Sequence, residues 1–351
     1  MERVTEAFYE RLGVKHPIFL APMGGGPGTP ELAAAVSRAG GLGSMGCAYM
    51  TPQQIREAAH RAGTPLHINL FAGGWDENAS GDATRMFAIL APIHQHLGIA
   101  PPKLPKIGPD PFPDQLKAVL DVRPAMFSFT FGVPSQQDLG ALRDAGILVA
   151  GTATTADEVR LLTEAGVDAI ALQGAEAGAH RGTFAHRFEE AMVPILELIE
   201  AAKRVTSLPL IAAGGIMTGA DVAAVLHRGA AATALGTAFL ATPESGASAA
   251  YKSALHASNA PSVITRAFSG RAARGLANEF HAMVDESAIL PYPVQNALTR
   301  PMRTAAAKRG EAGFLSLWAG TGVAKIRSMP AEELVQRLVE ELNQTSRSRG
   351  V

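Results

Sequence analysis

The chain repeats one pattern, in which a polar helix end runs into a glycine and a short apolar segment follows. The clearest examples are at Gly40, Gly63, Gly146, Gly166 and Gly229. Glycine in the left-handed conformation ends a helix without steric cost, and a short apolar run after it is typical of a buried parallel strand. The pattern therefore favours helices that alternate with parallel strands.

Helix starts are equally regular. Residues 51–54 (Thr-Pro-Gln-Gln) and 155–158 (Thr-Ala-Asp-Glu) match the capping box, in which a hydroxyl accepts from the third helical N–H. Pro30 follows Thr29 at a first helical position, where its missing N–H costs nothing.

About eight strands alternate with helical segments, which is typical of an α/β protein with a (β/α)₈ TIM barrel. The strands are expected to start near Ile18, Leu42, Leu66, Ala125, Ile147, Ala169, Leu210 and Ala232. The spacing breaks at 73–124 and 242–322, and these two insertions are expected to pack together as a smaller, mainly helical cap. The barrel then comprises 1–72 and 125–241. In the C-terminal segment 323–351, residues 331–342 have apolar side chains at helical spacing, so this helix should return to the barrel.

Composition excludes several classes of protein. With 31 Lys and Arg against 32 Asp and Glu, the net charge of −1 gives no footprint for nucleic acid or an anionic membrane. One Cys excludes a disulfide framework, and no metal site is expected. No signal peptide is recognisable, and the longest apolar run, 229–243, is shorter than the roughly 18 residues that a membrane span needs. A soluble, cytoplasmic protein is expected, and its oligomeric state is left open.

Two glycine-containing turns suggest a phosphate site. One strand ends at Gly214 and Gly215 before a helix start, and the next ends in the segment Ala234, Leu235, Gly236 and Thr237. Glycines let backbone N–H groups approach an anion, and the loops after strands 7 and 8 are the usual phosphate site of such barrels. No Walker A lysine motif is present, so a cofactor phosphate is favoured over nucleoside triphosphate hydrolysis.

The segment 41–46 (Gly-Leu-Gly-Ser-Met-Gly) matches G-x-G-x-x-G, but it lies along a strand, and position 66 is Leu rather than a ribose-binding acid. We assign these glycines to close packing in the barrel.

A second informative segment is 173–184, which begins with Gln173 at a strand end and contains His180. Gln173 can donate and accept hydrogen bonds, which suits a planar heterocycle. His180 is the best candidate for a general base, although a surface histidine is the plainer alternative.

Other strand ends are less decisive. Asn69 lies near the end of the third strand, where cofactor contact and structural pairing are comparable alternatives. Ala21, Pro22 and Met23 close the first strand, and Met23 can pack on a flat ligand. The aromatic residues of 127–131 are assigned to the core.

Three further residues are assigned no function. His94 and His96 lack a third metal ligand and are expected to be solvated, and Cys47 is expected to be a buried, inert thiol.

Four segments together resemble the nitronate monooxygenase family, formerly called 2-nitropropane dioxygenases. They are 21–25 (Ala-Pro-Met-Gly-Gly), 128–134 (Ser-Phe-Thr-Phe-Gly-Val-Pro), 174–182 (Gly-Ala-Glu-Ala-Gly-Ala-His-Arg-Gly) and 212–216 (Ala-Ala-Gly-Gly-Ile). The resemblance implies an FMN-containing barrel that oxidises alkyl nitronates with O₂ to a carbonyl compound and nitrite. It also implies that Asn69, Gln173 and Gly178 contact the flavin, that Gly215 and 234–237 hold the phosphate, and that His180 is catalytic.

Two departures from the family pattern stand out, because Ala179 replaces a glycine and Thr218 stands where Asp is common. The alternatives are an NAD(P)H-dependent flavin reductase of the enoyl-acyl carrier protein reductase type and a non-catalytic FMN-binding barrel. The physiological substrate stays open.

Overall fold

The computed structural model describes residues 2–257 and 261–348, and its centre is a barrel of eight parallel strands. Around the barrel the strand order is β1-β9-β8-β6-β5-β4-β3-β2. The strands are β1 (Ile18–Leu20), β2 (Gly43–Gly46), β3 (Leu66–Phe71), β4 (Met126–Thr130), β5 (Leu148–Ala153), β6 (Ala169–Gln173), β8 (Leu210–Ala213) and β9 (Ala232–Leu235). Each begins within one residue of its predicted start.

The barrel closes between β1 and the residue that precedes β2. Leu20 N donates to Leu42 O at 2.9 Å, and Leu42 N donates to Ile18 O at 3.1 Å. A parallel bridge pairs Phe19 with Leu42. The predicted (β/α)₈ barrel is therefore confirmed.

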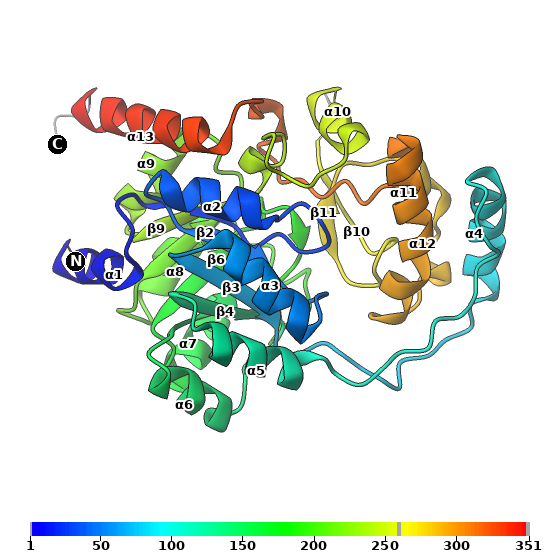
Figure 1. The fold of residues 1–351 in the computed structure, drawn as a ribbon, viewed down its shortest axis with the longest axis horizontal. Coiled ribbons are helices and arrows are strands. Elements are labelled where there is room, and N and C mark those ends of the chain that lie inside the picture. Colours follow the sequence, from blue (N-terminus) through cyan, green and yellow to red (C-terminus); the bar gives the residue numbers. More distant parts are fainter. Residues whose placement is uncertain (1, 258–260, 349–351) are drawn as a thin grey trace.

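Seven helices cover the outside of the barrel (Figure 1). They are α2 (Pro30–Arg38), α3 (Pro52–Ala62), α5 (Phe112–Val122), α6 (Gln136–Asp144), α7 (Ala156–Ala165), α8 (Ile195–Lys203) and α9 (Gly219–Arg228). At the amino-terminal ends of the strands, α1 (Glu2–Leu12) packs Phe8 and Leu12 against the bottom of the barrel. The last helix, α13 (Ala331–Ser348), packs on α9 and α2, as its amphipathic pattern predicts.

Several helix starts have the expected side-chain caps. Thr51 forms a capping box with Gln54, and Thr218 forms one with Asp221. Thr29, Ser135 and Thr155 each accept a backbone N–H of the first turn. Thr218 departs from the family pattern, and in the structure it is the N-cap residue of α9, with its hydroxyl accepting the backbone N–H of Asp221.

The cap lies beside the barrel, on the right of Figure 1. It contains α4 (Thr84–His96), α10 (Ala249–Ala257), α11 (Glu279–Met283) and α12 (Val294–Arg309), which share one hydrophobic cluster. Four short 3₁₀ helices complete the described helices: 237–239, 286–288, 312–314 and 323–325.

The cap differs from the prediction in two respects. First, α5 lies within 73–124 but packs on α3 and β3, because the barrel needs a helix between β3 and β4. Second, a three-stranded antiparallel sheet joins β10 (Val263–Thr265), β11 (Ala273–Gly275) and β7 (Ala179–His180). Strands of two or three residues are too short to show a periodicity of two. The boundaries at residues 72, 241 and 322 stay a prediction.

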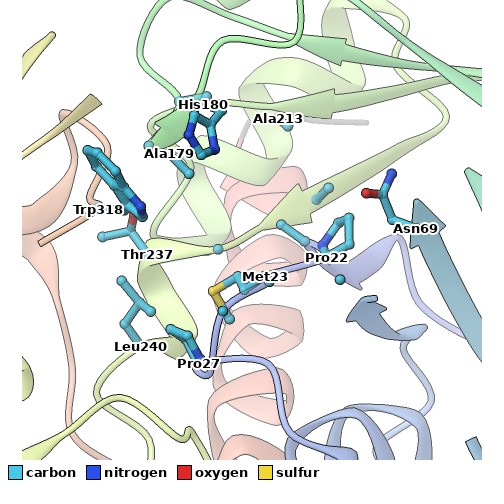
Figure 2. A pocket seen from close by; sticks show the side chains of 18 of the residues that line it. Pro22, Met23, Pro27, Asn69, Ala179, His180, Ala213, Thr237, Leu240 and Trp318 are labelled. Carbon is cyan, nitrogen blue, oxygen red and sulfur yellow. The ribbon is translucent and has the colours of Figure 1, made fainter. Parts of the chain in front are cut away.

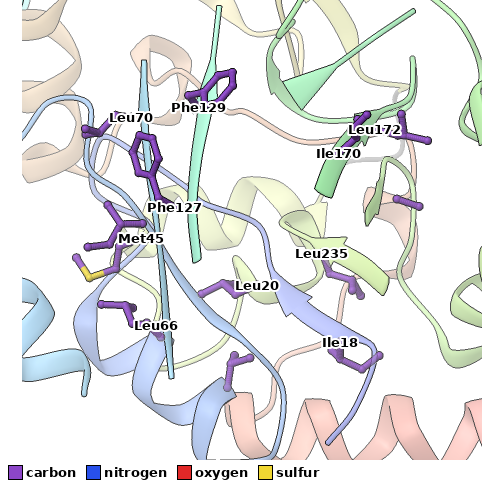
Figure 3. Close-up of a cluster of buried hydrophobic side chains, with 14 of the residues drawn as sticks. Ile18, Leu20, Met45, Leu66, Leu70, Phe127, Phe129, Ile170, Leu172 and Leu235 are labelled. Carbon is purple, nitrogen blue, oxygen red and sulfur yellow. The ribbon is translucent and has the colours of Figure 1, made fainter. Parts of the chain in front are cut away.

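Side chains alternate between two environments along each barrel strand. Those that point outward fill the space under the helices, and Figure 3 shows Leu70, Phe127 and Phe129 among them. The assignment of Phe127 and Phe129 to the core is confirmed. Those that point inward, such as Asn69 and Ser128, line a cavity.

The glycines of 41–46 have the packing role that the sequence suggests. A Cβ atom on Gly43 would lie 2.0 Å from Ala33 O, and one on Gly41 would lie 2.4 Å from Ile18 O. These glycines let α2 and β1 approach β2 closely.

Gly43→Ala should therefore lower the free energy of unfolding by about 1–3 kcal/mol, which is the usual cost of overpacking. The matched control is Gly140→Ala in α6, where the new Cβ meets nothing within 4 Å. Alanine should raise the stability there by about 0.5–1 kcal/mol, because glycine is a poor helix former. Urea unfolding measures both. Equal stability of the Gly43→Ala variant and the wild type would contradict the packing role.

Candidate active site

A cavity of about 780 Å³ opens at the carboxyl ends of the barrel strands, where the cap covers them. Inward-facing alanines of the barrel contribute to it: Ala150, Ala171, Ala213 and Ala234. Barrel interiors of this type are usually filled by bulky branched side chains. Small residues at these positions therefore leave room for a ligand.

The cavity brings together nearly all of the predicted site residues (Figure 2). It is lined by Ala21, Pro22, Met23, Asn69, Gln173, Gly178, His180, Gly214, Gly215, Ala234, Gly236 and Thr237. Leu235 is the exception, and a contact of its backbone with the cofactor phosphate stays a prediction. Because side chains alternate along β9, Leu235 points outward and is buried in the core under the helices.

A cradle of backbone groups follows β8 and β9. Gly214 and Gly215 have φ angles of +136° and +69°, which favour glycine. No backbone hydrogen bond from the amides of Gly215 and Gly236 is found within the described residues. A Cβ on Gly236 would have ordinary contacts only, the nearest being Ala21 Cβ at 3.5 Å. The cradle therefore has space and unused N–H donors.

Residues 319–321 of the C-terminal region close this cradle, and the sequence did not predict this role. Gly320 N donates to Thr237 Oγ1 at 2.9 Å, and Thr321 N donates to Glu176 O at 3.0 Å. A Cβ on Gly178 would lie 2.7 Å from Ala319 C, so only glycine fits beneath the segment. Such contacts between distant segments leave no local signal in the sequence.

Asn69 lies on the inner wall of the barrel among hydroxyl groups. Its Nδ2 donates to Ser128 Oγ at 2.8 Å and to Thr130 Oγ1 at 3.2 Å. His67 lies one layer deeper, between Ser44 and Ser128, and burial lowers its pKa to about 3. Of the two alternatives for Asn69, the structural pairing is present, and the side chain also faces the cavity.

Gln173 is held by the segment that follows β6. Its Nε2 donates to His180 O at 2.8 Å, and its Oε1 accepts from Gly182 N at 2.8 Å. Both ends of the amide thus bond to the backbone on either side of Arg181. Fewer of its hydrogen bonds are therefore available to a heterocycle than the sequence suggests.

His180 lies in β7, which pairs with β11 of the cap. Its Nε2 is 2.8 Å from Ser269 Oγ. Burial, together with the charges of Arg271 and Arg303, lowers the pKa of His180 to about 3. At neutral pH the imidazole is therefore neutral and able to accept a proton.

The neighbours of His180 in sequence have structural tasks. Ala179 has a φ of +64°, a conformation that suits the glycine it replaces, and its methyl group lines the cavity. Arg181 is almost fully buried, and its guanidinium donates to the carbonyls of Gly174, Gln173 and Ala191. The charge of Arg181 is therefore used inside the fold rather than offered to a substrate.

Aromatic side chains that the sequence did not assign to the site surround His180. Phe71, Phe131, Tyr292 and Trp318 have ring centroids 5.7–6.4 Å from the imidazole. Phe131 has a φ of +77° and forms part of the cavity wall, so it is not a core residue like Phe127. Backbone strain of this kind is concentrated at functional sites.

Three arginines of the cap lie around this region, and two of them, Arg300 and Arg303, line the cavity. Arg271 Cζ lies 3.7 Å from the Phe131 ring centroid, and Arg300 Cζ lies 5.5 Å from that of Tyr49. Arg303 Nη2 donates to Asn296, whereas its buried Nε has no hydrogen-bond partner. None of the three forms an ion pair within the described part of the chain. Arg300 and Arg303 lie three residues apart on α12, a spacing that the sequence does show.

Residues to which the sequence assigned no function are buried or paired. His94 is buried and its Nδ1 lies 2.6 Å from Ala100 O, so the expectation of a solvated side chain was wrong. His96 is exposed and pairs with Glu311. Burial raises the pKa of the Cys47 thiol to about 12, which agrees with an inert thiol.

The described residues provide neither a metal-binding cluster nor a membrane-spanning helix. Among residues 2–257 and 261–348, no group of three or more His, Cys, Asp or Glu side chains is placed to hold a metal ion. None of the described helices is long and apolar enough to cross a membrane.

Comparisons with known proteins agree with this geometry. The family model described as nitronate monooxygenase matches residues 5–341. The nitronate monooxygenase of Pseudomonas aeruginosa is 40% identical, over 97% of this chain and 99% of that protein. The nitroalkane oxidase structure from Streptomyces ansochromogenes has 39% identity and a TM-score of 0.88, covering 96% of this chain and 98% of the other. FabK from Thermotoga maritima has 25% identity and a TM-score of 0.77, covering 97% of each chain. The chain therefore belongs to the nitronate monooxygenase family of oxidoreductases.

Proposed function

We propose that this protein is an FMN-dependent enzyme that oxidises alkyl nitronates with O₂ to a carbonyl compound and nitrite. The observation that carries the proposal is the cavity that joins a glycine cradle to a neutral, half-buried His180. The family membership supports the reaction type, and the named relatives act on nitronates or nitroalkanes.

The residues fit FMN. Its phosphate is proposed to occupy the cradle formed by Gly214, Gly215, Gly236 and Thr237, where unused backbone N–H groups favour an anion. Asn69, Gln173 and Gly178 are proposed to border the ring system and its ribityl chain, with Ala21, Pro22, Met23 and Ala234 lining the same space. When bound, FMN supplies the acceptor for the substrate's electrons, which pass on to O₂.

The charges of the cavity favour an anionic substrate. A nitronate is an anion, and Arg300 and Arg303 line the cavity without ion-pair partners in the described residues. A neutral nitroalkane must first lose a proton, and we assign that step to His180. A base whose pKa is near 3 accepts this proton with difficulty. The nitronate should therefore be the better substrate.

Two alternatives have less support. An enoyl-thioester reductase that uses NAD(P)H would agree with the FabK fold, but the identity to FabK is 25% against 40% for the nitronate monooxygenase. A non-catalytic flavin-binding barrel has no need for a half-buried histidine beside Arg271 and Arg303, which form no ion pair within the described residues.

The cradle can be tested by a charge change at Gly236. Purified wild-type protein should be yellow and release FMN on denaturation. Gly236→Asp places a carboxylate beside the phosphate, and it should weaken FMN binding at least about 10-fold more than the nearly isosteric Gly236→Asn, a difference of about 1.4 kcal/mol. Fluorescence titration of apoprotein with FMN measures both. Equal affinities of the two variants would contradict a phosphate at this position.

The proton transfer can be tested with His180→Ala. Loss of a positioned base should lower kcat/KM for a neutral nitroalkane by about 10²–10⁴-fold, and far less for the preformed nitronate, which has no proton to lose. FMN content should stay at the wild-type level. His60→Ala, an exposed histidine on α3, is the control and should change neither activity. Equal losses on both substrates would refute the role as a base.

The pH dependence follows from the lowered pKa of His180. A group whose pKa lies near 3 stays in its basic form as the pH falls through 6.5, and it is lost as a base only near pH 3. The kcat/KM for a neutral nitroalkane should therefore have no acid limb between pH 8 and about pH 5. A limb with a midpoint near 6.5, the ordinary pKa of histidine, would show that Arg271, Arg303 and burial do not act on His180 as described.

A further inference from the structure

The cap provides a fully buried serine whose hydroxyl lies against the ring of His180. Ser269 lies in the turn 266–272 between β10 and β11, and its Oγ is 2.8 Å from His180 Nε2. No motif in the sequence points to this residue, because it lies 89 positions from His180.

Hydrogen bonds around Ser269 determine which ring nitrogen carries the proton. A hydroxyl has one proton to donate and two lone pairs to accept with. Ser269 Oγ donates to Arg271 O at 3.1 Å and accepts from Arg271 N at 3.3 Å. Arg271 O has no other hydrogen-bond donor within the described residues. When the hydroxyl proton is used for Arg271 O, the remaining lone pair of Ser269 accepts, and this arrangement favours Nε2 of His180 as the donor.

The other ring nitrogen is then free to act. With Nε2 protonated, a neutral imidazole carries its lone pair on Nδ1. Nδ1 has no hydrogen-bond partner in the part of the chain that the structure describes, and His180 lines the cavity. A fixed tautomer of this kind sets the orientation and the role of a catalytic histidine.

The turn that carries Ser269 is held rigidly. Gly270 has a φ of +81°, and its N donates to Arg266 O at 2.7 Å. A Cβ on Gly270 would lie 2.4 Å from Leu290 O, so the loop that precedes α12 packs directly on this turn. The backbone of His180 is fixed separately, by Gln173 and by pairing with Ala273. Ring and backbone are thus positioned by different parts of the protein.

We propose that Ser269 is a positioning residue that holds His180 in its Nε2–H tautomer and so presents Nδ1 as the base toward the substrate. The kinetic part of this inference rests on the proposed function, whereas the tautomer itself does not. The cations that face His180 are Arg271 from the same turn and Arg303 from α12, and Tyr292 packs against the ring. None of these groups hydrogen-bonds to the imidazole, so Ser269 alone selects the tautomer.

The test compares Ser269→Ala with Ser269→Thr, which keeps the hydroxyl. In ¹⁵N-labelled holoenzyme, long-range ¹H–¹⁵N spectra report the tautomer of His180, whose signals are identified by their loss in His180→Ala. The wild type and Ser269→Thr should show the Nε2–H form, and Ser269→Ala should show a mixture. Ser269→Ala should also lower kcat/KM for a neutral nitroalkane by about 10–100-fold, as expected for a misplaced base. Its kcat/KM for the nitronate should stay close to the wild-type value.

Ser262→Ala is the matched control, because Ser262 adjoins the same sheet and contacts Arg274 rather than His180. It should change neither the tautomer nor the activities. An Nδ1–H form in the wild type, or an unchanged tautomer in Ser269→Ala, would overturn the proposal. If the tautomers are as expected but the wild type oxidises neither substrate, the proposed function fails and the positioning role stands.

Discussion

The site depends on the hydrogen bonds that close the barrel between Leu20 and Leu42. Closure brings the carboxyl ends of eight parallel strands to one rim, and the alternation of side chains turns every second residue toward the axis. Because Ala150, Ala171, Ala213 and Ala234 are small, the rim surrounds a cavity instead of a packed core. Glycines at 41–46 permit the close packing of β2 that this closure requires.

Local sequence signals predicted the barrel well because each strand, helix start and helix end is specified by residues that are close together in the sequence. Glycine after a helix, a hydroxyl before one, and an apolar run between them are read within a few residues, and all eight strand starts follow from them. The residues at strand ends reached the cavity for the same reason. Leu235 does not line the cavity because its side chain points to the opposite face of β9 from that of Ala234.

Contacts between distant segments could not be predicted. The three-stranded cap sheet joins residues 179–180 to 263–275, and the guanidinium of Arg181 is buried by carbonyls that fold back around it. The burial of His94 and the position of α5 on α3 depend on the same kind of packing. The arginines near His180 come from the cap, so their meeting with the barrel is visible only in three dimensions.

The site therefore combines a rigid barrel rim with a cap that supplies charge and orientation. The barrel contributes the glycine cradle and the polar inner wall, while Ser269, Arg271 and Arg303 act on His180 from the cap. This arrangement explains why the half-buried His180 stays neutral beside cations that attract an anion. A barrel without the cap would leave the imidazole solvated and its orientation undefined.

The most direct test of this account is the absorbance of the bound flavin when the holoenzyme is mixed with an alkyl nitronate in the absence of O₂. The account predicts that the yellow absorbance is lost on mixing and returns when O₂ is admitted, with release of nitrite. A flavin that keeps its absorbance with the nitronate but loses it with NADPH would contradict the account and favour a reductase.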